Sequence, residues 1–332
     1  MAHTPAVAGD MVFIGSCNGI FRALDRRTGE VRWATQAGPE SVRYFFHGDP
    51  LITDKLVVVG ADVGGAAGVI ARFHAFDRST GRTRWTQPAG NGAWGATSGD
   101  SWSAFAITAE KELVALDLES GALRWSFPVN VWGWLGPAAW DGRVFTGARD
   151  GSVYALNANT GRVEWRTELG SPISTDVTAT DSGLYAGTGD GAMHRLDTAR
   201  GSVLASLKID AKWKPRSVPV STGDSLLVLL TDQGEDYRAL VSLDPMLSRI
   251  RWRQEAVKPW STTRVFVWGN SAVVGTSAGE LTAYCASDGT KGWSRTVKGS
   301  VRSIGGSADA LYVSTSQGNL YALGPVSACT TR

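Results

Sequence analysis

The chain has 332 residues, a formal net charge of +2 and only 19% charged residues. Lys and Arg form no run, which argues against binding to nucleic acid or another polyanion as the main activity. The sequence has no window of about 18 consecutive apolar residues, so no membrane span is expected. Its 40 glycines and 14 tryptophans suit many short strands joined by tight turns.

A short phrase recurs along the chain at a spacing of about 40 residues, which is typical of a stacked repeat. Well-preserved copies occupy residues 23–33 (ALDRRTGEVRW), 75–85, 115–125 and 155–165. Eroded copies occupy residues 195–205, 242–252 and 283–293, and a partial copy occupies residues 321–324. Because these copies account for the whole length, we expect one all-β domain over residues 1–332.

Each part of the phrase has a physical role. The alternating apolar residues before Asp25 predict a half-buried strand, and the Asp side chain can bond the backbone of the following turn. Gly29 suits a turn position with positive φ, and Trp33 offers a large ring that can lie between neighbouring units. In the fifth copy Ala205 replaces the Trp, so this unit is expected to pack less tightly.

With its consensus Ala-x-Asp-x-x-x-Gly-x-x-x-Trp, the phrase resembles the tryptophan-docking motif of bacterial PQQ-like (pyrroloquinoline quinone) β-propellers. The resemblance covers nearly the whole chain. It implies an eight-bladed β-propeller of four-stranded antiparallel blades, with seven blades as the alternative. The family includes quinoprotein alcohol dehydrogenases, the lipoprotein scaffold of the outer-membrane assembly machine and sensor domains of bacterial kinases, so it does not select one activity.

The termini and the cysteines leave alternatives open. The N-terminus lacks the basic and apolar segments of a secretory signal, so the chain as written is expected in the cytoplasm; it is periplasmic or extracellular if a signal was removed. Cys17, Cys285 and Cys329 have no metal-site spacing. A closed ring would make the first blade and the tail neighbours, so a Cys17–Cys329 disulfide and free thiols both remain open.

Long connections depart from the repeat, and function is expected there because the scaffold does not need them. Each is expected to join an outer strand to the next inner strand, on one face around the mouth of a central channel. These segments are residues 36–50, 61–69, 90–102, 128–134, 210–219 and 258–264.

Aligning the second strands of the blades predicts a ring of equivalent positions at that mouth. The ring comprises His47, Trp94, Trp134, Asp176, Arg216, Arg264 and Arg302. Basic and aromatic groups facing one opening suit a small anionic or aromatic ligand. The full set of candidate ligand-binding residues is Arg43, Trp94, Asp100, Trp102, Trp132, Trp134, Arg216, Trp260, Arg264 and Arg302. The alternative is that these are ordinary loop and channel residues.

His47 and Asp176 are the candidate catalytic residues, because an imidazole that titrates near neutrality beside a carboxylate can transfer protons. The alternative is a half-buried histidine that bonds a loop carbonyl. The four histidines are scattered across unrelated blades and the sequence has no His-x-x-x-His or carboxylate cluster, so neither a serine hydrolase nor a metal site is predicted.

Two functions from different classes follow. The first is a non-catalytic, monomeric module that binds a ligand or a protein partner at a Trp-rich rim. The second is a cofactor-independent lyase, cyclase or isomerase that acts on a small anionic substrate at the same mouth. Quinoprotein dehydrogenases that share the motif are longer, hold calcium beside the quinone and carry a vicinal Cys-Cys ring. This sequence has no Cys-Cys pair, so no cofactor is expected.

Overall fold

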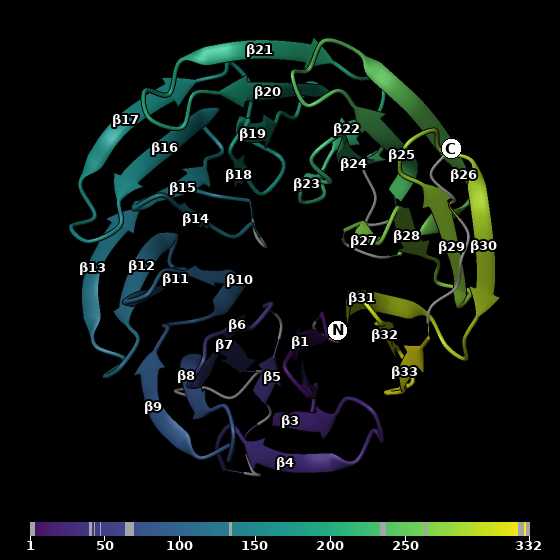
Figure 1. The fold of residues 1–332 in the computed structure, drawn as a ribbon. Helices are drawn as coiled ribbons and strands as arrows, with labels where there is room; N and C mark the ends of the chain where they lie inside the picture. Colours follow the sequence, from purple (N-terminus) through teal and green to yellow (C-terminus); the bar gives the residue numbers. More distant parts are fainter. Residues whose placement is uncertain are drawn as a thin grey trace. The chain divides into compact units, whose positions relative to one another are not determined.

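The computed structural model describes residues 4–39, 42, 44–46, 48–63, 70–132, 135–232, 237–261, 264–324 and 329. Its regular secondary structure in these residues is entirely β, arranged as eight successive antiparallel sheets (Figure 1). The prediction of an eight-bladed β-propeller is therefore confirmed, and the seven-bladed alternative is wrong. Within the described residues no helix has the length and apolar character needed to cross a bilayer.

The strands of the first four blades follow the chain order. Blade one contains β1 (Ala6–Ala8), β2 (Met11–Gly15), β3 (Ile20–Asp25) and β4 (Val31–Gln36). Blade two contains β5 (Tyr44–Phe46), β6 (Leu51–Ile52), β7 (Leu56–Val63), β8 (Arg72–Asp77) and β9 (Thr83–Pro88). Blade three contains β10 (Ala93–Gly99), β11 (Ser103–Thr108), β12 (Glu112–Asp117) and β13 (Leu123–Pro128). Blade four contains β14 (Ala138–Trp140), β15 (Arg143–Gly147), β16 (Ser152–Asn157) and β17 (Val163–Glu168).

The last four blades repeat this order until the final one. Blade five contains β18 (Thr178–Thr180), β19 (Gly183–Gly187), β20 (Ala192–Leu196) and β21 (Val203–Lys208). Blade six contains β22 (Lys214–Pro215), β23 (Val220–Ser221), β24 (Leu226–Thr231), β25 (Tyr237–Leu243) and β26 (Ile250–Trp260). Blade seven contains β27 (Phe266–Trp268), β28 (Ser271–Gly275), β29 (Glu280–Cys285) and β30 (Lys291–Thr296). Blade eight contains β31 (Val301–Ser307), β32 (Ala310–Thr315) and β33 (Leu320–Leu323).

The chain forms two compact units. Unit one comprises Met1–Val144 and Leu156–Arg162, and unit two comprises Phe145–Ala155 and Val163–Arg332. Blades one to three belong to unit one and blades five to eight to unit two, while the boundary passes through blade four. The single domain over residues 1–332 stays a prediction.

In five blades the recurring Trp links the blade to the turn of the next. The Nε1–H of Trp33 donates to the carbonyl oxygen of Arg78 at 3.0 Å, and the ring lies on Gly81. A Cβ built on Gly81 would approach that ring to 2.5 Å, and its φ of +71° also favours glycine. The same indole-to-carbonyl bond recurs in the pairs Trp85–Leu118, Trp125–Ala158, Trp165–Thr198 and Trp252–Ala286, at 2.9 to 3.1 Å.

The Asp of the phrase organises its own turn. Asp25 Oδ1 accepts the backbone N–H groups of Arg27 and Thr28, at 2.8 and 2.9 Å. A salt bridge with Arg32 holds the pKa of Asp25 well below its ordinary value, and the two backbone hydrogen bonds act in the same direction. The capping role predicted for this Asp is confirmed.

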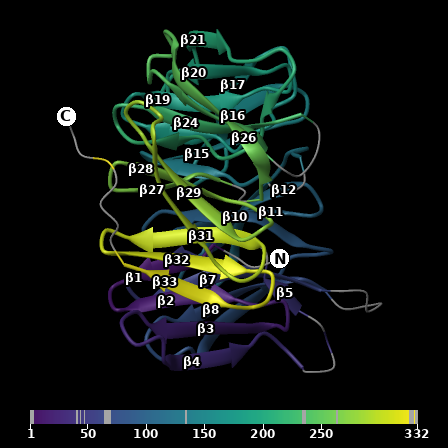
Figure 2. The ribbon, with the colours of Figure 1, turned by 90° about the vertical axis from the view of Figure 1, so that its right-hand side faces the viewer.

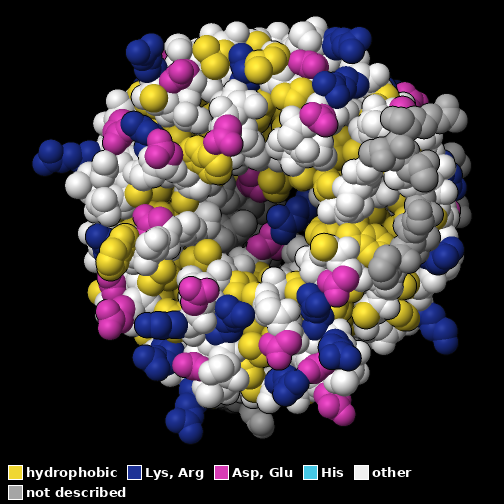
Figure 3. Space-filling model, viewed as in Figure 1, with side chains coloured by type: hydrophobic (Ala, Val, Ile, Leu, Met, Phe, Trp, Pro, Cys, Tyr) yellow, Lys and Arg dark blue, Asp and Glu magenta, His cyan; other side chains and the backbone are white. Residues whose placement is uncertain are grey.

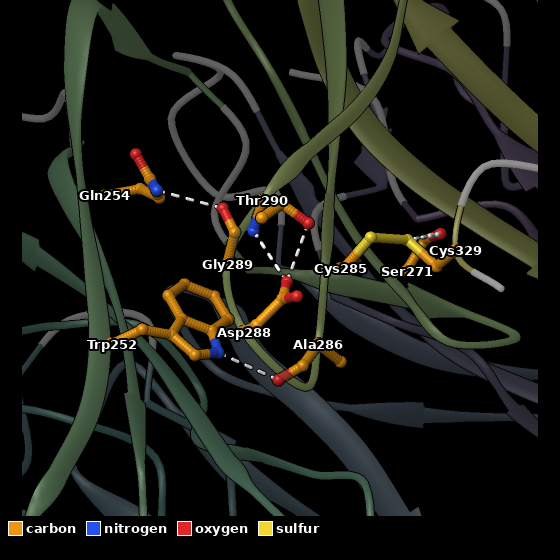
Figure 4. Close-up of a disulfide and its surroundings, with 9 residues drawn as sticks. All are labelled: Trp252, Gln254, Ser271, Cys285, Ala286, Asp288, Gly289, Thr290 and Cys329. Atoms are coloured by element: carbon orange, nitrogen blue, oxygen red, sulfur yellow. Dashed lines mark hydrogen bonds between the residues drawn. A yellow bond between two sulfur atoms is a disulfide. The ribbon is translucent and has the colours of Figure 1, made fainter. Parts of the chain in front are cut away.

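The cysteine pairing differs from both sequence-based alternatives. Cys285, at the end of β29, forms a disulfide with Cys329, and their Cα atoms lie 5.5 Å apart (Figure 4). The Cys17–Cys329 disulfide is therefore wrong, and so is the alternative that both of these cysteines are free thiols. Cys17 is exposed and takes no part in this disulfide. Cys285 is the partner of Cys329 because Cys329, which follows β33 in the chain, lies beside blade seven.

Candidate functional site

The connection between blades five and six carries a cluster of charged and aromatic side chains. Asp210 Oδ1 accepts the backbone N–H groups of Lys212 and Trp213, at 2.7 and 2.8 Å. Its Oδ2 lies 2.5 Å from a terminal nitrogen of Arg253, on the outer strand β26. The Arg253 guanidinium also stacks over the Trp213 ring, 4.7 Å from its centroid. Arg253 thus fixes the connection to blade six.

This cluster is internally neutralised. Burial raises the pKa of Asp210, but the hydrogen bond from Arg253 and those from the backbone outweigh it, so the net pKa lies below the ordinary value. Asp210 is therefore ionised at neutral pH, and Arg253 also contacts Glu255 at 3.2 Å. An anionic ligand at Arg253 would have to displace a carboxylate, so the cluster serves the loop rather than a ligand.

Two of the predicted arginines occupy equivalent positions in the repeat. Arg216 follows Pro215, whose carbonyl oxygen accepts the hydroxyl of Ser174 from the preceding blade at 2.7 Å. Arg302 follows Val301, whose carbonyl accepts the hydroxyl of Ser261 in the same way at 2.7 Å. Both arginines are exposed. The repeat therefore places Arg216 and Arg302 in register, two blades apart.

Asp176 and Arg264 do not share that register. The backbone N–H of Arg216 donates to the second strand of blade six. In blades five and seven, the N–H groups that make the equivalent bond belong to Ser174 and Ser261. Asp176 and Arg264 therefore lie two and three residues beyond the ring position. Both side chains are half-buried. The ring expected from sequence is wrong at these two residues, because connection lengths differ between blades.

Trp260 is part of the core. It is 3% exposed at the end of β26 and packs edge-on against Tyr284, with ring centroids 6.1 Å apart. The expectation of an exposed rim Trp at this position is therefore wrong. Apolar residues of β24 and β28 belong to the same buried cluster.

In unit one, the candidates of blade three lie at opposite ends of β10. Trp94 pairs with Ile107 near the beginning of β10, whereas Asp100 and Trp102 form the turn after it. Asp100 Oδ1 accepts the backbone N–H groups of Trp102 and Ser103, both at 2.7 Å. A strand of this length separates its ends by roughly 20 Å. The expectation that these residues share one face is therefore wrong.

Three of the tryptophans whose side chains the structure describes are exposed. Trp102 is 69% exposed, and Trp132 and Trp140 are each 37% exposed. Trp140 lies at the turn between β14 and β15, which corresponds to the turn between β10 and β11 that carries Trp102. Arg43, His47 and Trp134 lie outside the described residues, as does the side chain of Trp94. The proton-transfer pair of His47 and Asp176 stays a prediction.

Sequence reasoning missed a hydrogen-bonded series in blade five. Ser206 Oγ lies 2.8 Å from His194 Nδ1, and His194 Nε2 lies 3.1 Å from Thr188 Oγ1. Thr188 Oγ1 lies 2.5 Å from Asp190 Oδ1. Burial lowers the pKa of His194, and nearby Asp190 offsets this only in part, so the imidazole is neutral at pH 7.

The blade-seven counterpart indicates a structural role for this series. His194 pairs with Ser206 across β20 and β21, and Thr282 pairs with Ser294 across β29 and β30. The hydroxyls of that second pair lie 3.5 Å apart. A polar cross-strand pair is thus a recurring feature at this position. Only the three-dimensional arrangement of the strands revealed it.

The described residues do not fit a quinone site of the dehydrogenase type. Two of the three cysteines form a disulfide between β29 and the tail, so they offer no vicinal Cys-Cys ring. In the described part of the chain, no three or more His, Cys, Asp or Glu side chains group as metal ligands.

Comparison with known proteins places this geometry in a family. The model of a family designated PQQ_2 and described as outer membrane protein assembly factor BamB matches residues 1–72, 70–213 and 208–327. The chain belongs to this family. The solved structure of BamB from Moraxella catarrhalis is similar with a TM-score of 0.78 and 20% identity, over 96% of this chain and 95% of that one.

Quinoprotein dehydrogenases are related over shorter segments or in fold alone. The 1-butanol dehydrogenase (quinone) of Thauera butanivorans is 32% identical over 99 residues, which are 28% of this chain and only 16% of the dehydrogenase. The quinohemoprotein alcohol dehydrogenase of Comamonas testosteroni has a TM-score of 0.70 and 15% identity, over 94% of this chain and 70% of that one. These similarities support the repeat and the fold.

Proposed function

We propose that this member of the PQQ_2 family is a non-catalytic scaffold that binds a protein partner. The observation that carries the proposal is Trp102, a large apolar side chain that is 69% exposed yet held in a well-defined turn. Asp100 fixes its backbone N–H, and its carbonyl oxygen accepts the N–H of Leu118 at 2.9 Å. A pre-ordered, exposed Trp is the type of residue that dominates protein interfaces.

Neighbouring features extend this surface within unit one. Leu123 begins the outer strand of blade three and is 51% exposed. The next residue, Arg124, donates to Ser103 Oγ at 2.8 Å, which joins this strand to the Trp102 turn. Trp140 lies at the corresponding turn of blade four. We call Trp102, Leu123 and Trp140 the turn surface.

Charge and covalent chemistry agree with this role. Lys/Arg and Asp/Glu side chains are interspersed on the face shown in Figure 3, which suits a mixed protein partner better than a polyanion. The Cys285–Cys329 disulfide favours an oxidising compartment, so we propose a periplasmic or extracellular location. We propose no quinone cofactor, because the described donor groups do not fit one.

Substitution of the turn surface tests this function. We expect the double variant Trp102→Ser, Trp140→Ser to lose at least tenfold in retention of a partner captured from an extract of the source bacterium. Val31→Ser is the matched control, because Val31 is 55% exposed in blade one, outside the turn surface. All three proteins should melt at the same temperature. Equal retention by the parent and the double variant would contradict the proposal.

A further inference from the structure

Among the described residues, blade eight has no outer strand of the kind that completes the other blades. Within the described residues, β33 pairs with β32 only, whereas blades five, six and seven carry the outer strands β21, β26 and β30 (Figures 1 and 2). None of the four residues of β33 is fully buried, although most residues of the corresponding strand β29 are. The outer edge of this sheet is open to a further strand.

In the neighbouring blade seven, the indole of Trp293 occupies the position from which the Trp of other blades bonds the turn of the next blade. Trp293, on β30, is 7% exposed, and its Nε1–H has no hydrogen-bond partner among the described residues. The equivalent Trp165 and Trp252 donate to backbone carbonyls of the next blade's turn. A buried polar group without a partner is costly, so Trp293 marks a position where a backbone carbonyl belongs.

A second contact to the missing turn is also absent. In blade four, Thr167 lies two residues after the Trp and donates to the carbonyl oxygen of Gly201 in the next blade's turn, at 2.7 Å. In blade six, Gln254 donates to Gly289 in the same way, at 2.9 Å. Arg295 holds the equivalent position, and its guanidinium bonds the adjacent Ser294 carbonyl instead. Three contacts are therefore missing among the described residues: strand pairing along the edge of β33, an acceptor for the Trp293 indole and a turn carbonyl for Arg295. One segment made of a turn and a strand would supply all three.

The next described residue of this chain lies elsewhere. Cys329 comes five residues after Gly324 and is bonded to Cys285 on blade seven, with its sulfur 3.4 Å from Ser271 Oγ (Figure 4). In blade one, by contrast, the residue five positions beyond Asp25 is Glu30, whose carbonyl oxygen accepts the Asp25 N–H directly before the outer strand β4 begins at Val31. The disulfide therefore holds Cys329 at blade seven, away from the position at which an outer strand of blade eight would start.

We propose that the open edge of β33 and the Trp293 indole form a docking site for an extended segment of a protein partner. The segment adds as an antiparallel fourth strand, and a carbonyl of the turn that precedes it accepts the Trp293 Nε1–H. Strand addition of this kind draws its affinity from backbone hydrogen bonds and its specificity from alternate side chains. This inference rests on the proposed scaffold function and names a second contact surface for it.

A peptide copied from blade four serves as the probe. Residues 157–168 (NANTGRVEWRTE) contain a well-preserved turn and outer strand. The control peptide carries proline in place of Glu164 and Trp165, which removes N–H donors from both edges of the strand. Hydrogen exchange of Leu320–Leu323 and the indole signal of Trp293, assigned with Trp293→Phe, report on binding.

In the full chain alone, we expect the amides of Leu320–Leu323 to exchange at least tenfold faster than those of Ile20–Asp25. The probe peptide should slow this exchange at least tenfold and shift the Trp293 indole signal, whereas the proline peptide should do neither. Trp293→Phe should weaken binding of the probe by about fivefold, the equivalent of one hydrogen bond.

Three results would overturn the inference. Strong protection of Leu320–Leu323 in the dilute chain alone would show that this chain already covers the edge. Protection that rises with protein concentration would assign the edge to a second copy. Absence of any effect of the probe on β33 and Trp293 would remove the site. If any of these occurs while the turn-surface variants still lose their partner, the scaffold function stands and only the strand-docking site is wrong.

Discussion

The hydroxyl of Tyr185 donates a hydrogen bond to the carbonyl oxygen of Pro245 at 2.8 Å. In the preceding blade the corresponding carbonyl, that of Thr198, accepts the indole N–H of Trp165. Because blade five has Ala205 at the Trp position, Tyr185 from the second strand supplies the contact that the indole makes elsewhere. Tyr185 is 1% exposed and so buries an aromatic ring at this contact, while the looser packing expected from Ala205 stays a prediction.

Tyr185→Phe removes this hydrogen bond and leaves the ring in place. We expect a loss of about 1 kcal/mol in the free energy of unfolding, because the Pro245 carbonyl loses its donor. Urea unfolding of the parent and variant measures the difference. Tyr154→Phe is the control, since its hydroxyl makes an exposed 3.4 Å contact with Asp150 and should contribute little. Equal losses in the two variants would show that the Pro245 contact has no special weight.

Ala205→Trp restores the repeat consensus and should nevertheless destabilise the protein. Tyr185 and Leu247, which is 3% exposed, already belong to the core beside Ala205. An added indole would overpack this core, at a cost of about 1–3 kcal/mol. Combined with Tyr185→Ala, the same substitution should recover part of the stability that Tyr185→Ala loses. A thermal-melting cycle over the four proteins tests this, and a stabilised Ala205→Trp single variant would refute it.

His74 should make unit one sensitive to acid. It is 1% exposed among the rings of Tyr44, Phe46 and Phe76, and its Nε2 has no hydrogen-bond partner among the described residues. Burial, with a smaller effect from Arg72, lowers the pKa of His74 from 6.5 to about 4.

Folding therefore favours the neutral imidazole, and its contribution is complete above pH 6.5 and declines as the pH falls towards 4. The slope is about 1.4 kcal/mol per pH unit across that window, because the unfolded chain takes up the proton first. His74→Phe should remove this slope, as measured by urea unfolding between pH 7.5 and 4. His194→Phe is not a suitable control, because His194 makes side-chain hydrogen bonds. Identical pH profiles for the parent and His74→Phe would rule out this role.

The disulfide should stabilise blades seven and eight. It closes a loop with a sequence separation of 44 residues, for which a contribution of about 2–4 kcal/mol is typical. Cys329→Ser and Cys285→Ser should lower the melting temperature equally, and a reducing agent should affect the parent but neither variant. Cys17→Ser, outside the disulfide, should melt like the parent. Mass spectrometry under non-reducing conditions verifies the bond, and an unchanged melting temperature in both variants would contradict its stabilising role.

The sequence by itself determined the eight-bladed fold, because the Asp, Gly and Trp of the phrase act through local turn geometry and through contacts that repeat from blade to blade. The same periodicity placed Arg216 and Arg302 in one register. The sequence predicted an exposed rim position for both Trp102 and Trp260, and only the tertiary structure showed that Trp260 is buried, since burial depends on strands distant in sequence.

Three further features also depend on segments distant in sequence. They are Tyr185 in place of a Trp, Cys285 as the partner of Cys329, and the open edge beside Trp293. In each case a residue outside the repeated phrase, or the absence of one, decides the contact. A periodic pattern specifies what every blade has in common, whereas these features arise where neighbouring blades differ, and packing between non-local segments settles them.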